Sequence, residues 1–310
     1  MATTLDLGSI DALRPAQPSG IAAWPRVVWR FARHKPLGAF GGVVILLMLF
    51  CALFVDAALF GSNEPLLAPQ HYNDQSFGEE NLGPSWEHPL GTDDLGRDIL
   101  SRIVYGARVS LMVGGIAIGI AAVTGVPLGL LAGYVGGRLD GLIMRVMDAL
   151  LAFPAILLAI ALMAVLGPSL QNAMIAIGII YVPAFARITR ANVLSLREKE
   201  FVEAARALGA GSLYVAGVVI LPNCLSPLIV QGSLGIANAI LVEAALSFLG
   251  LGVQPPEPSW GSMLAFGRSL LGQAPWYATF PGLAIFVTVL ALNFLGDGLR
   301  EAFDPRLHAQ

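Results

Sequence analysis

The sequence predicts an all-α integral membrane protein with six transmembrane helices and both termini in the cytoplasm. Three observations support this fold class. Only 13% of the residues are charged, against about 25% in ordinary soluble domains. The mean hydropathy is +0.72, and five long windows contain no Asp, Glu, Lys or Arg. One soluble core cannot bury this much apolar surface, which argues against a soluble enzyme, a disordered chain and a nucleic-acid-binding protein.

The charge-free windows locate the transmembrane helices, because one span needs about 20 apolar residues. The window Ala149–Ala186 is divided by a Gly-Pro-Ser turn signal at 167–169, so it holds two spans. The window Ala207–Val242 contains Pro222 and Pro227, so its first part need not cross the membrane. The six expected spans are Leu37–Phe60, Val109–Tyr134, Leu150–Leu166, Leu170–Ala186, Leu225–Leu249 and Phe280–Leu299.

The distribution of Lys and Arg indicates the orientation, since the cytoplasmic segments of membrane proteins carry the excess of positive charge. If the N-terminus is inside, the inner segments hold 14 of the 18 basic residues and the outer segments hold four. Both termini are therefore expected in the cytoplasm. Eight of the 21 acidic residues lie between Glu64 and Asp98, in the first outer loop.

Four segments follow from this layout: a cytoplasmic tail over 1–35, the first span with its extracytoplasmic loop over 36–105, the remaining spans over 106–300, and a cytoplasmic tail over 301–310. Within the first tail, apolar residues recur at helical spacing between Trp24 and Phe31, opposite arginines. This pattern is typical of an amphipathic helix in the membrane interface. A second interpretation, compatible with the first, is that this segment is the basic flank of the first span.

Glycines recur at four-residue intervals in the second expected span, at Gly125, Gly129, Gly133 and Gly137. Small residues on one helix face let two backbones approach closely in lipid. We expect these glycines to pack against another helix of this chain, because six helices offer many internal neighbours. The alternative is packing against a partner subunit.

The sequence contains no recognisable energy source. A phosphate-binding P-loop needs a lysine after a glycine, and the two lysines are Lys35, before a proline, and Lys199, between two glutamates. The four histidines are scattered and form no metal-binding pattern. Ion-coupled carriers keep ionisable groups inside their bundle, and Glu243 is the deepest such group. A single such residue gives an ion-coupled carrier little to work with, so that function stays an alternative. The energy for transport is expected to come from another chain.

The loop between the fourth and fifth expected spans predicts a short helix. Residues 196–208 are strong helix formers without Gly or Pro. Phe201, two alanines and Leu208 share one face of this helix, and Gly209 supplies its C-cap. An amphipathic helix with small residues at its centre suits insertion into a groove on a cytoplasmic partner. The alternative is a helix that lies on the membrane surface.

This loop, about 195–222, resembles the EAA loop of ABC importer permeases. Glu203-Ala204-Ala205 is followed by three residues, Gly209, nine residues and Val219-Ile220-Leu221-Pro222. The family pattern is E-A-A-x3-G-x9-I-x-L-P, so the one departure is Val219 in place of Ile. Segments that resemble the C-type permease subunit of dipeptide, oligopeptide and nickel importers are His88–Asp98, Ser101–Leu111 and Glu243–Gly261. The resemblance covers about residues 25–306.

The resemblance implies a type I ABC importer transmembrane domain in the cytoplasmic membrane of a prokaryote. Such a chain would form a pore with a second, different permease subunit, surrounded by lipid, and move di- or oligopeptides by alternating access. Two cytoplasmic ATPase subunits would hold ATP and Mg, so this chain would carry no cofactor and no catalytic residue. An extracytoplasmic substrate-binding protein would deliver the peptide. The coupling-helix residues that the resemblance implies are Phe201, Glu203, Ala204, Ala205, Leu208 and Gly209.

Overall fold

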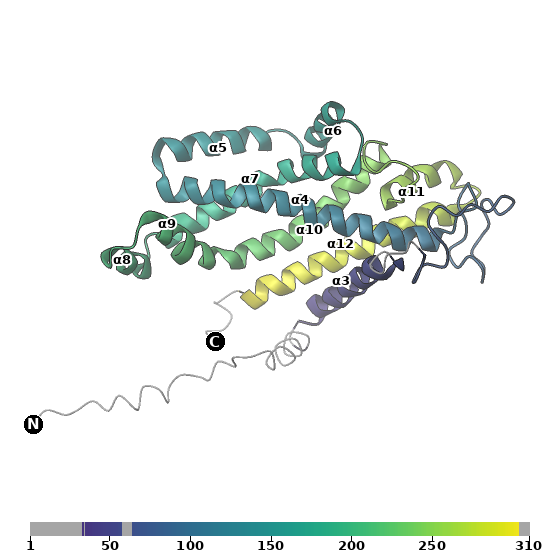
Figure 1. The fold of residues 1–310 in the computed structure, drawn as a ribbon, viewed down its shortest axis with the longest axis horizontal. Coiled ribbons are helices and arrows are strands. Elements are labelled where there is room, and N and C mark those ends of the chain that lie inside the picture. The colour runs from purple at the N-terminus through teal and green to yellow at the C-terminus, as the bar shows by residue number, and fades with distance from the viewer. Residues whose placement is uncertain (1–32, 34, 58–63, 304–310) are drawn as a thin grey trace, which may run out of the picture.

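The computed structural model describes residues 33, 35–57 and 64–303, which form an elongated helical bundle (Figure 1). The described residues contain helices and two isolated β-bridges but no β-sheet. The expected interfacial helix over 24–35 lies almost entirely outside them. The helical elements are α3 (Pro36–Phe54), α4 (Ile99–Val135), α5 (Gly137–Leu151), α6 (Ala155–Leu166), α7 (Leu170–Leu196), α8 (Glu200–Ala207), α9 (Ser212–Tyr214), η3 (Val215–Ile220), η4 (Leu221–Cys224), α10 (Leu225–Phe248), α11 (Trp260–Gly267), η5 (Arg268–Leu270) and α12 (Pro275–Phe303).

Five helical runs in the described part of the chain are long and apolar enough to cross a membrane. The α5–α6 pair makes up to six if it counts as one bent span. The all-helical membrane fold and the range of five to six spans therefore agree with the sequence prediction. The five runs are Pro36–Phe54, Ile99–Val135, Leu170–Leu196, Ser212–Phe248 and Pro275–Ala302.

The third expected span, Leu150–Leu166, is wrong as a single straight helix. α5 and α6 are separated by a short break and their axes differ by 91°. Pro154 breaks the helix, because proline lacks an amide donor and holds the preceding residue in an extended conformation. α6 has 12 residues, or about 18 Å of helix, against a hydrocarbon core of about 30 Å. It does not span the membrane by itself.

The second span starts well before the expected Val109, because α4 continues outward through charged residues. Its N-cap is Asp98, whose carboxylate accepts a hydrogen bond from the Ser101 amide at 2.7 Å. Within the added turns, Arg108 donates to both carboxylate oxygens of Asp56 at 3.0 and 2.8 Å. This pairing allows an arginine to lie in a membrane-spanning helix near its outer end.

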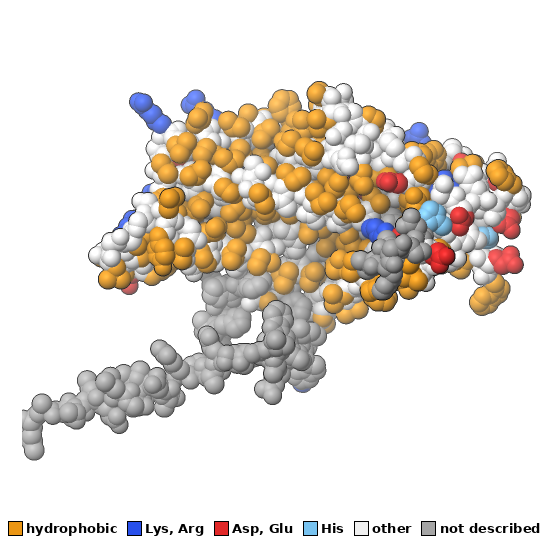
Figure 2. All heavy atoms as spheres, in the orientation of Figure 1, with side chains coloured by type: hydrophobic (Ala, Val, Ile, Leu, Met, Phe, Trp, Pro, Cys, Tyr) orange, Lys and Arg blue, Asp and Glu red, His pale blue; other side chains and the backbone are white. Residues whose placement is uncertain are grey.

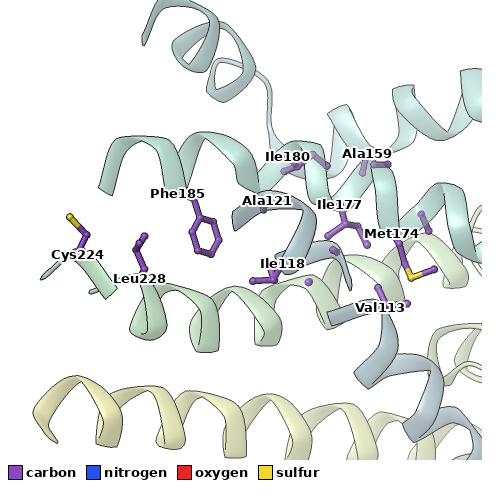
Figure 3. Close-up of a cluster of buried hydrophobic side chains, with 14 of the residues drawn as sticks. Val113, Ile118, Ala121, Ala159, Met174, Ile177, Ile180, Phe185, Cys224 and Leu228 are labelled. Carbon is purple, nitrogen blue, oxygen red and sulfur yellow. The ribbon is translucent and has the colours of Figure 1, made fainter. Parts of the chain in front are cut away.

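The main hydrophobic core lies between α4, α7 and α10. Figure 3 shows Ile118 of α4, Ile177 and Phe185 of α7 and Leu228 of α10 directed into the space that the three helices enclose. All four side chains are buried. These three helices therefore form the packed centre of the bundle.

Three of the four predicted packing glycines face α7 at contact distance. A Cβ atom on Gly125 would lie 2.6 Å from the Val182 carbonyl oxygen, and one on Gly133 would lie 2.9 Å from Val193 Cβ. Gly129, between them, would overlap the backbone of α7 in the same way. The neighbour of this glycine stripe within the described chain is thus α7.

Gly137 does not belong to that stripe. It follows the end of α4 and begins α5, its φ is +62°, and a Cβ there would meet no atom of the described residues within 4 Å. The regular spacing in the sequence continues past the end of the helix. Gly137 therefore serves the turn between α4 and α5 rather than the contact between α4 and α7.

The two ends of the bundle differ in charge. α3 begins and α12 ends at the same end as α8, and Lys35 forms an ion pair with Glu301 there (Figure 1). Figure 2 shows basic side chains at the α5 and α8 end, while acidic and histidine side chains gather at the opposite end, where some basic side chains lie among them. This arrangement matches the orientation that the Lys and Arg distribution predicts.

The outer loop from Glu64 to Asp98 is held in its fold by two buried acidic residues, Asp93 and Asp98. Asp93 accepts from the Leu95 and Arg97 amides at 2.9 Å each, and from Arg97 Nε at 2.6 Å. Asp98 also pairs with His88 Nδ1 at 3.1 Å. The acidity of this loop is therefore partly structural, because these two carboxylates hold the loop against the start of α4.

Candidate functional site

The predicted coupling helix is α8, a short helix at one end of the bundle beside α9 (Figure 1). It is shorter than the expected 196–208, because α7 continues to Leu196 and a turn separates the two helices. Glu200 and Glu203 lie in its first turn and Arg206 lies in its last turn. These charges have the signs that stabilise each end of the helix dipole.

Gly209 ends α8 in a left-handed conformation, with φ of +83°. The Gly209 amide donates to the Arg206 carbonyl at 2.9 Å, and the Ala210 amide donates to the Ala205 carbonyl at 3.1 Å. This hydrogen-bond pair is the Schellman motif, which favours glycine because a left-handed residue carries a steric cost from Cβ. The glycine of the EAA pattern thus fixes where the chain turns back towards η3.

α8 contacts the bundle mainly through Val202, and Ala205, one of the predicted partner-binding residues, lies on this inner side rather than on the exposed one. Val202 is fully buried and, with Ala205, packs into the main core together with residues of η3. Phe201 is 43% exposed and Leu208 is 90% exposed, so these two point away from the core. Sequence reasoning missed Val202, although its three-residue spacing from Ala205 is a helical signal.

The exposed surface of α8 contains most of the residues that the EAA pattern selects. Glu203, Ala204 and Gly209 are exposed, as are Phe201 and Leu208. Leu213 of α9 is also 90% exposed beside them in the sequence. An exposed surface that combines apolar side chains with an acidic one on a short helix is the kind of surface that binds in a partner's groove.

Polar contacts tie the α8 region to the inner end of α4. The Arg206 guanidinium lies over the Tyr134 ring, 5.7 Å from its centroid. Arg197, in the turn before α8, donates from Nη1 to the Gly133 carbonyl at 3.1 Å. These contacts connect the α8 region to α4 and, through the glycine contact, to α7. The sequence alone carried no signal for either contact.

We expect Val202→Asp to detach α8 from the bundle, because an unpaired charge in this buried site is unfavourable. Trypsin should then cleave at Lys199 or Arg206 at least several-fold faster than in the unmodified protein in mild detergent. Ala207→Asp is the matched control, since Ala207 is an exposed residue of the same helix. Equal cleavage rates for both variants would contradict the assignment of Val202 as the anchor.

No group of three or more His, Cys, Asp or Glu side chains suited to a metal ion occurs among the described residues. Cys51 and Cys224 are free. The fold is a bundle of membrane-spanning helices, and its distinctive exposed element is a short helix at the basic end. These features define a multi-pass membrane protein with an exposed helix suited to binding a partner.

Comparison with known families identifies the class more closely. Residues 125–309 match the family model of the binding-protein-dependent transport system inner membrane component. Residues 23–84 match the N-terminal transmembrane domain of oligopeptide transport permease C. The chain belongs to the family of binding-protein-dependent transport system inner membrane components, and it is a multi-pass permease of the ABC importer type.

Relatives resemble this chain along most of its length. The dipeptide transport system permease protein DppC of Alkalihalophilus pseudofirmus is 47% identical, covering 94% of this chain and 92% of the relative. The di/tripeptide transport system permease protein DppC of Pseudomonas aeruginosa is 48% identical, covering 89% and 90%. The glutathione transport system permease protein GsiD of Pectobacterium atrosepticum is 44% identical, covering 91% of each chain.

The fold also resembles a solved transporter. A chain of the inward-facing MetNI methionine ABC transporter aligns with a TM-score of 0.55 and 19% identity, covering 65% of this chain and 95% of that chain. This likeness supports the type I importer fold. The family assignment favours the permease function over an ion-coupled carrier.

Proposed function

We propose that this chain is the C-type permease subunit of an ATP-driven peptide importer, and that α8 is the helix that receives the ATPase subunits. The observation that carries the coupling role is the division of α8 into a buried anchor, Val202, and an exposed surface around Glu203 and Leu208. A helix exposed on this side can be held by a partner without disturbing the core. Its end at Gly209 returns the chain to η3.

The proposed assembly contains a second permease subunit, two cytoplasmic ATPase subunits and an extracytoplasmic binding protein, all in or against the lipid bilayer. ATP and Mg belong to the ATPase subunits, since this sequence has no phosphate-binding lysine motif. No nucleic acid takes part. This chain supplies half of the path for the substrate, and the energy comes from its neighbours.

Coupling then requires that closure of the ATPase pair bias the bundle between two conformations. We propose that α8 moves with the ATPase surface and transmits the motion through two contacts. One is the Arg206 guanidinium over Tyr134, and the other is the Arg197 hydrogen bond to Gly133. Both act at the inner end of α4, where the glycine contact with α7 begins.

Peptides are the proposed substrates because relatives similar over most of the chain are named for dipeptide, di/tripeptide and glutathione transport. These compounds share a peptide backbone and differ in side chains and length. Selectivity among them is expected to lie in the binding protein, which presents the substrate to the permease.

The test is to purify the complex from membranes in mild detergent and then reconstitute it in liposomes. The ATPase subunits and the second permease should copurify with this chain. Uptake of a labelled dipeptide should require ATP and the binding protein, and should persist when an ionophore dissipates ion gradients. Uptake by this chain alone, abolished by the ionophore, would support the ion-coupled alternative instead.

A further inference from the structure

A hollow of ≈ 410 Å³ lies at the outer end of α4, opposite the end that carries α8. Its walls come from the end of α3, the outer loop, the first turns of α4, the start of α7 and the loop after α10. Apolar contributions include Met112 and Leu170. The charged and aromatic side chains that line it are Asp56, His71, Tyr72, Tyr105, Arg108 and Glu257.

Tyr105 is the first sign that this hollow receives a ligand. The residue is 5% exposed, and its hydroxyl has no hydrogen-bond partner among the described residues. Buried polar atoms almost always have a partner, so an exception needs an explanation. The adjacent carboxylate of Asp56 is held by Arg108 through both of its oxygens. Tyr105 thus lines the hollow and has a buried hydroxyl whose hydrogen-bonding capacity is unused by the described residues.

Glu257 is the second sign. It is exposed and forms no ion pair with any described residue, and it lines two neighbouring hollows of ≈ 400 and ≈ 230 Å³ as well. The loop that carries it is anchored to α10, since the Val253 amide donates to Ser247 Oγ at 3.1 Å and Ser247 donates to the buried Glu243 at 2.7 Å. The backbone before Glu257 is therefore tied to α10, and Glu257 places an acidic side chain on the rim of the hollow.

Aromatic rings surround the same space. The Tyr72 and Tyr105 ring centroids are 5.0 Å apart, and His71 lies 4.3 Å from Tyr72. The faces of such rings attract cations. A carboxylate on the rim, aromatic rings on the wall and one unpartnered hydroxyl together suit an ammonium group that has a hydrogen-bond acceptor beside it.

We infer that this hollow binds the amino-terminal end of a peptide as it enters the permease. The peptide ammonium lies between Glu257 and the aromatic rings, and the first carbonyl oxygen accepts a hydrogen bond from the Tyr105 hydroxyl. Towards the inner end of α4, the helix face that carries Met112 continues to Gly115 and Gly119. A Cβ at either glycine would meet no described atom within 4 Å. This inference rests on the proposed function, because it assigns an entrance site to the proposed substrate.

The experiment uses the assembled transporter with Cys51 and Cys224 replaced by alanine and with Met112→Cys inside the hollow. A maleimide labels the introduced thiol in the absence of the binding protein. Millimolar dialanine should slow labelling several-fold, whereas N-acetyl-dialanine, which has no ammonium, should not. Adding Tyr105→Phe or Glu257→Gln should weaken this protection by roughly two- to ten-fold, the range for loss of one hydrogen bond or charged contact.

Glu80→Gln is the matched control, because Glu80 is an exposed acid of the outer loop that does not line the hollow. It should keep full protection by dialanine. Equal protection by both peptides, no protection by either, or full protection in the Tyr105 and Glu257 variants would each overturn the inference. ATP-dependent dipeptide uptake by the unmodified complex would in those cases leave the proposed function standing, and its absence would overturn both.

Discussion

Replacing Gly129 with leucine will destabilise the folded bundle by more than about 3 kcal/mol, beyond the usual cost of overpacking a core. A side chain at this position overlaps the Ala186 carbonyl, and its Cβ lies 2.7 Å from Thr189 Cβ. Backbone atoms of α7 cannot turn aside as a flexible side chain could, so α4 and α7 must separate. Thermal unfolding of the purified protein in detergent measures the loss, together with the yield of monodisperse protein.

Gly119→Leu on the same helix provides the control for this prediction. A Cβ at Gly119 meets no described atom within 4 Å, so leucine there should change the thermal stability little. The two variants share helix propensity and added hydrophobicity and differ in their surroundings. If both lose stability equally, the loss comes from α4 itself, and the assigned contact with α7 is wrong.

Gly209→Pro will reduce ATP-dependent peptide uptake at least ten-fold, while the protein still inserts into the membrane. Proline cannot adopt the φ of +83° found at this position. It also removes the amide that donates to the Arg206 carbonyl. The Schellman motif at the end of α8 is lost, and α8 no longer packs against η3. Uptake and ATP hydrolysis are both measured in proteoliposomes, since loss of coupling changes their ratio.

Gly211→Pro is the matched substitution two residues further along. Gly211 has a φ of −68°, which proline accepts, and its Cβ space is open. This variant should transport normally.

Glu203→Arg should abolish transport, as Gly209→Pro is expected to impair it, because it reverses the charge on the exposed face of α8 without changing the fold. Normal uptake by Gly209→Pro or Glu203→Arg would count strongly against α8 as the coupling helix.

The membrane class and the position of the EAA loop could be predicted because both depend on local sequence. Hydrophobic spans lack charged residues over their whole length, and a glycine such as Gly209 marks the C-terminal end of the helix before it. The prediction of the third span as one straight helix failed because local hydropathy does not reveal a change in helix direction. Composition around Pro154 remains apolar on both sides, so hydropathy continues where the backbone turns by 91°. Hydropathy measures how apolar a segment is, and it carries no information on the direction in which its helix runs.

The scarcity of charged residues was enough to assign this chain to the multi-pass membrane proteins, because charge-free windows are visible in the sequence without any knowledge of its folding. Which side of each helix is covered became clear from the three-dimensional packing alone. It placed Val202 inward and Leu208 outward, and it separated Gly137 from the other three glycines. It also brought Tyr105 and Glu257, which are separated by about half of the chain, to one hollow. Such contacts join residues distant in sequence, and the packing of whole helices decides them.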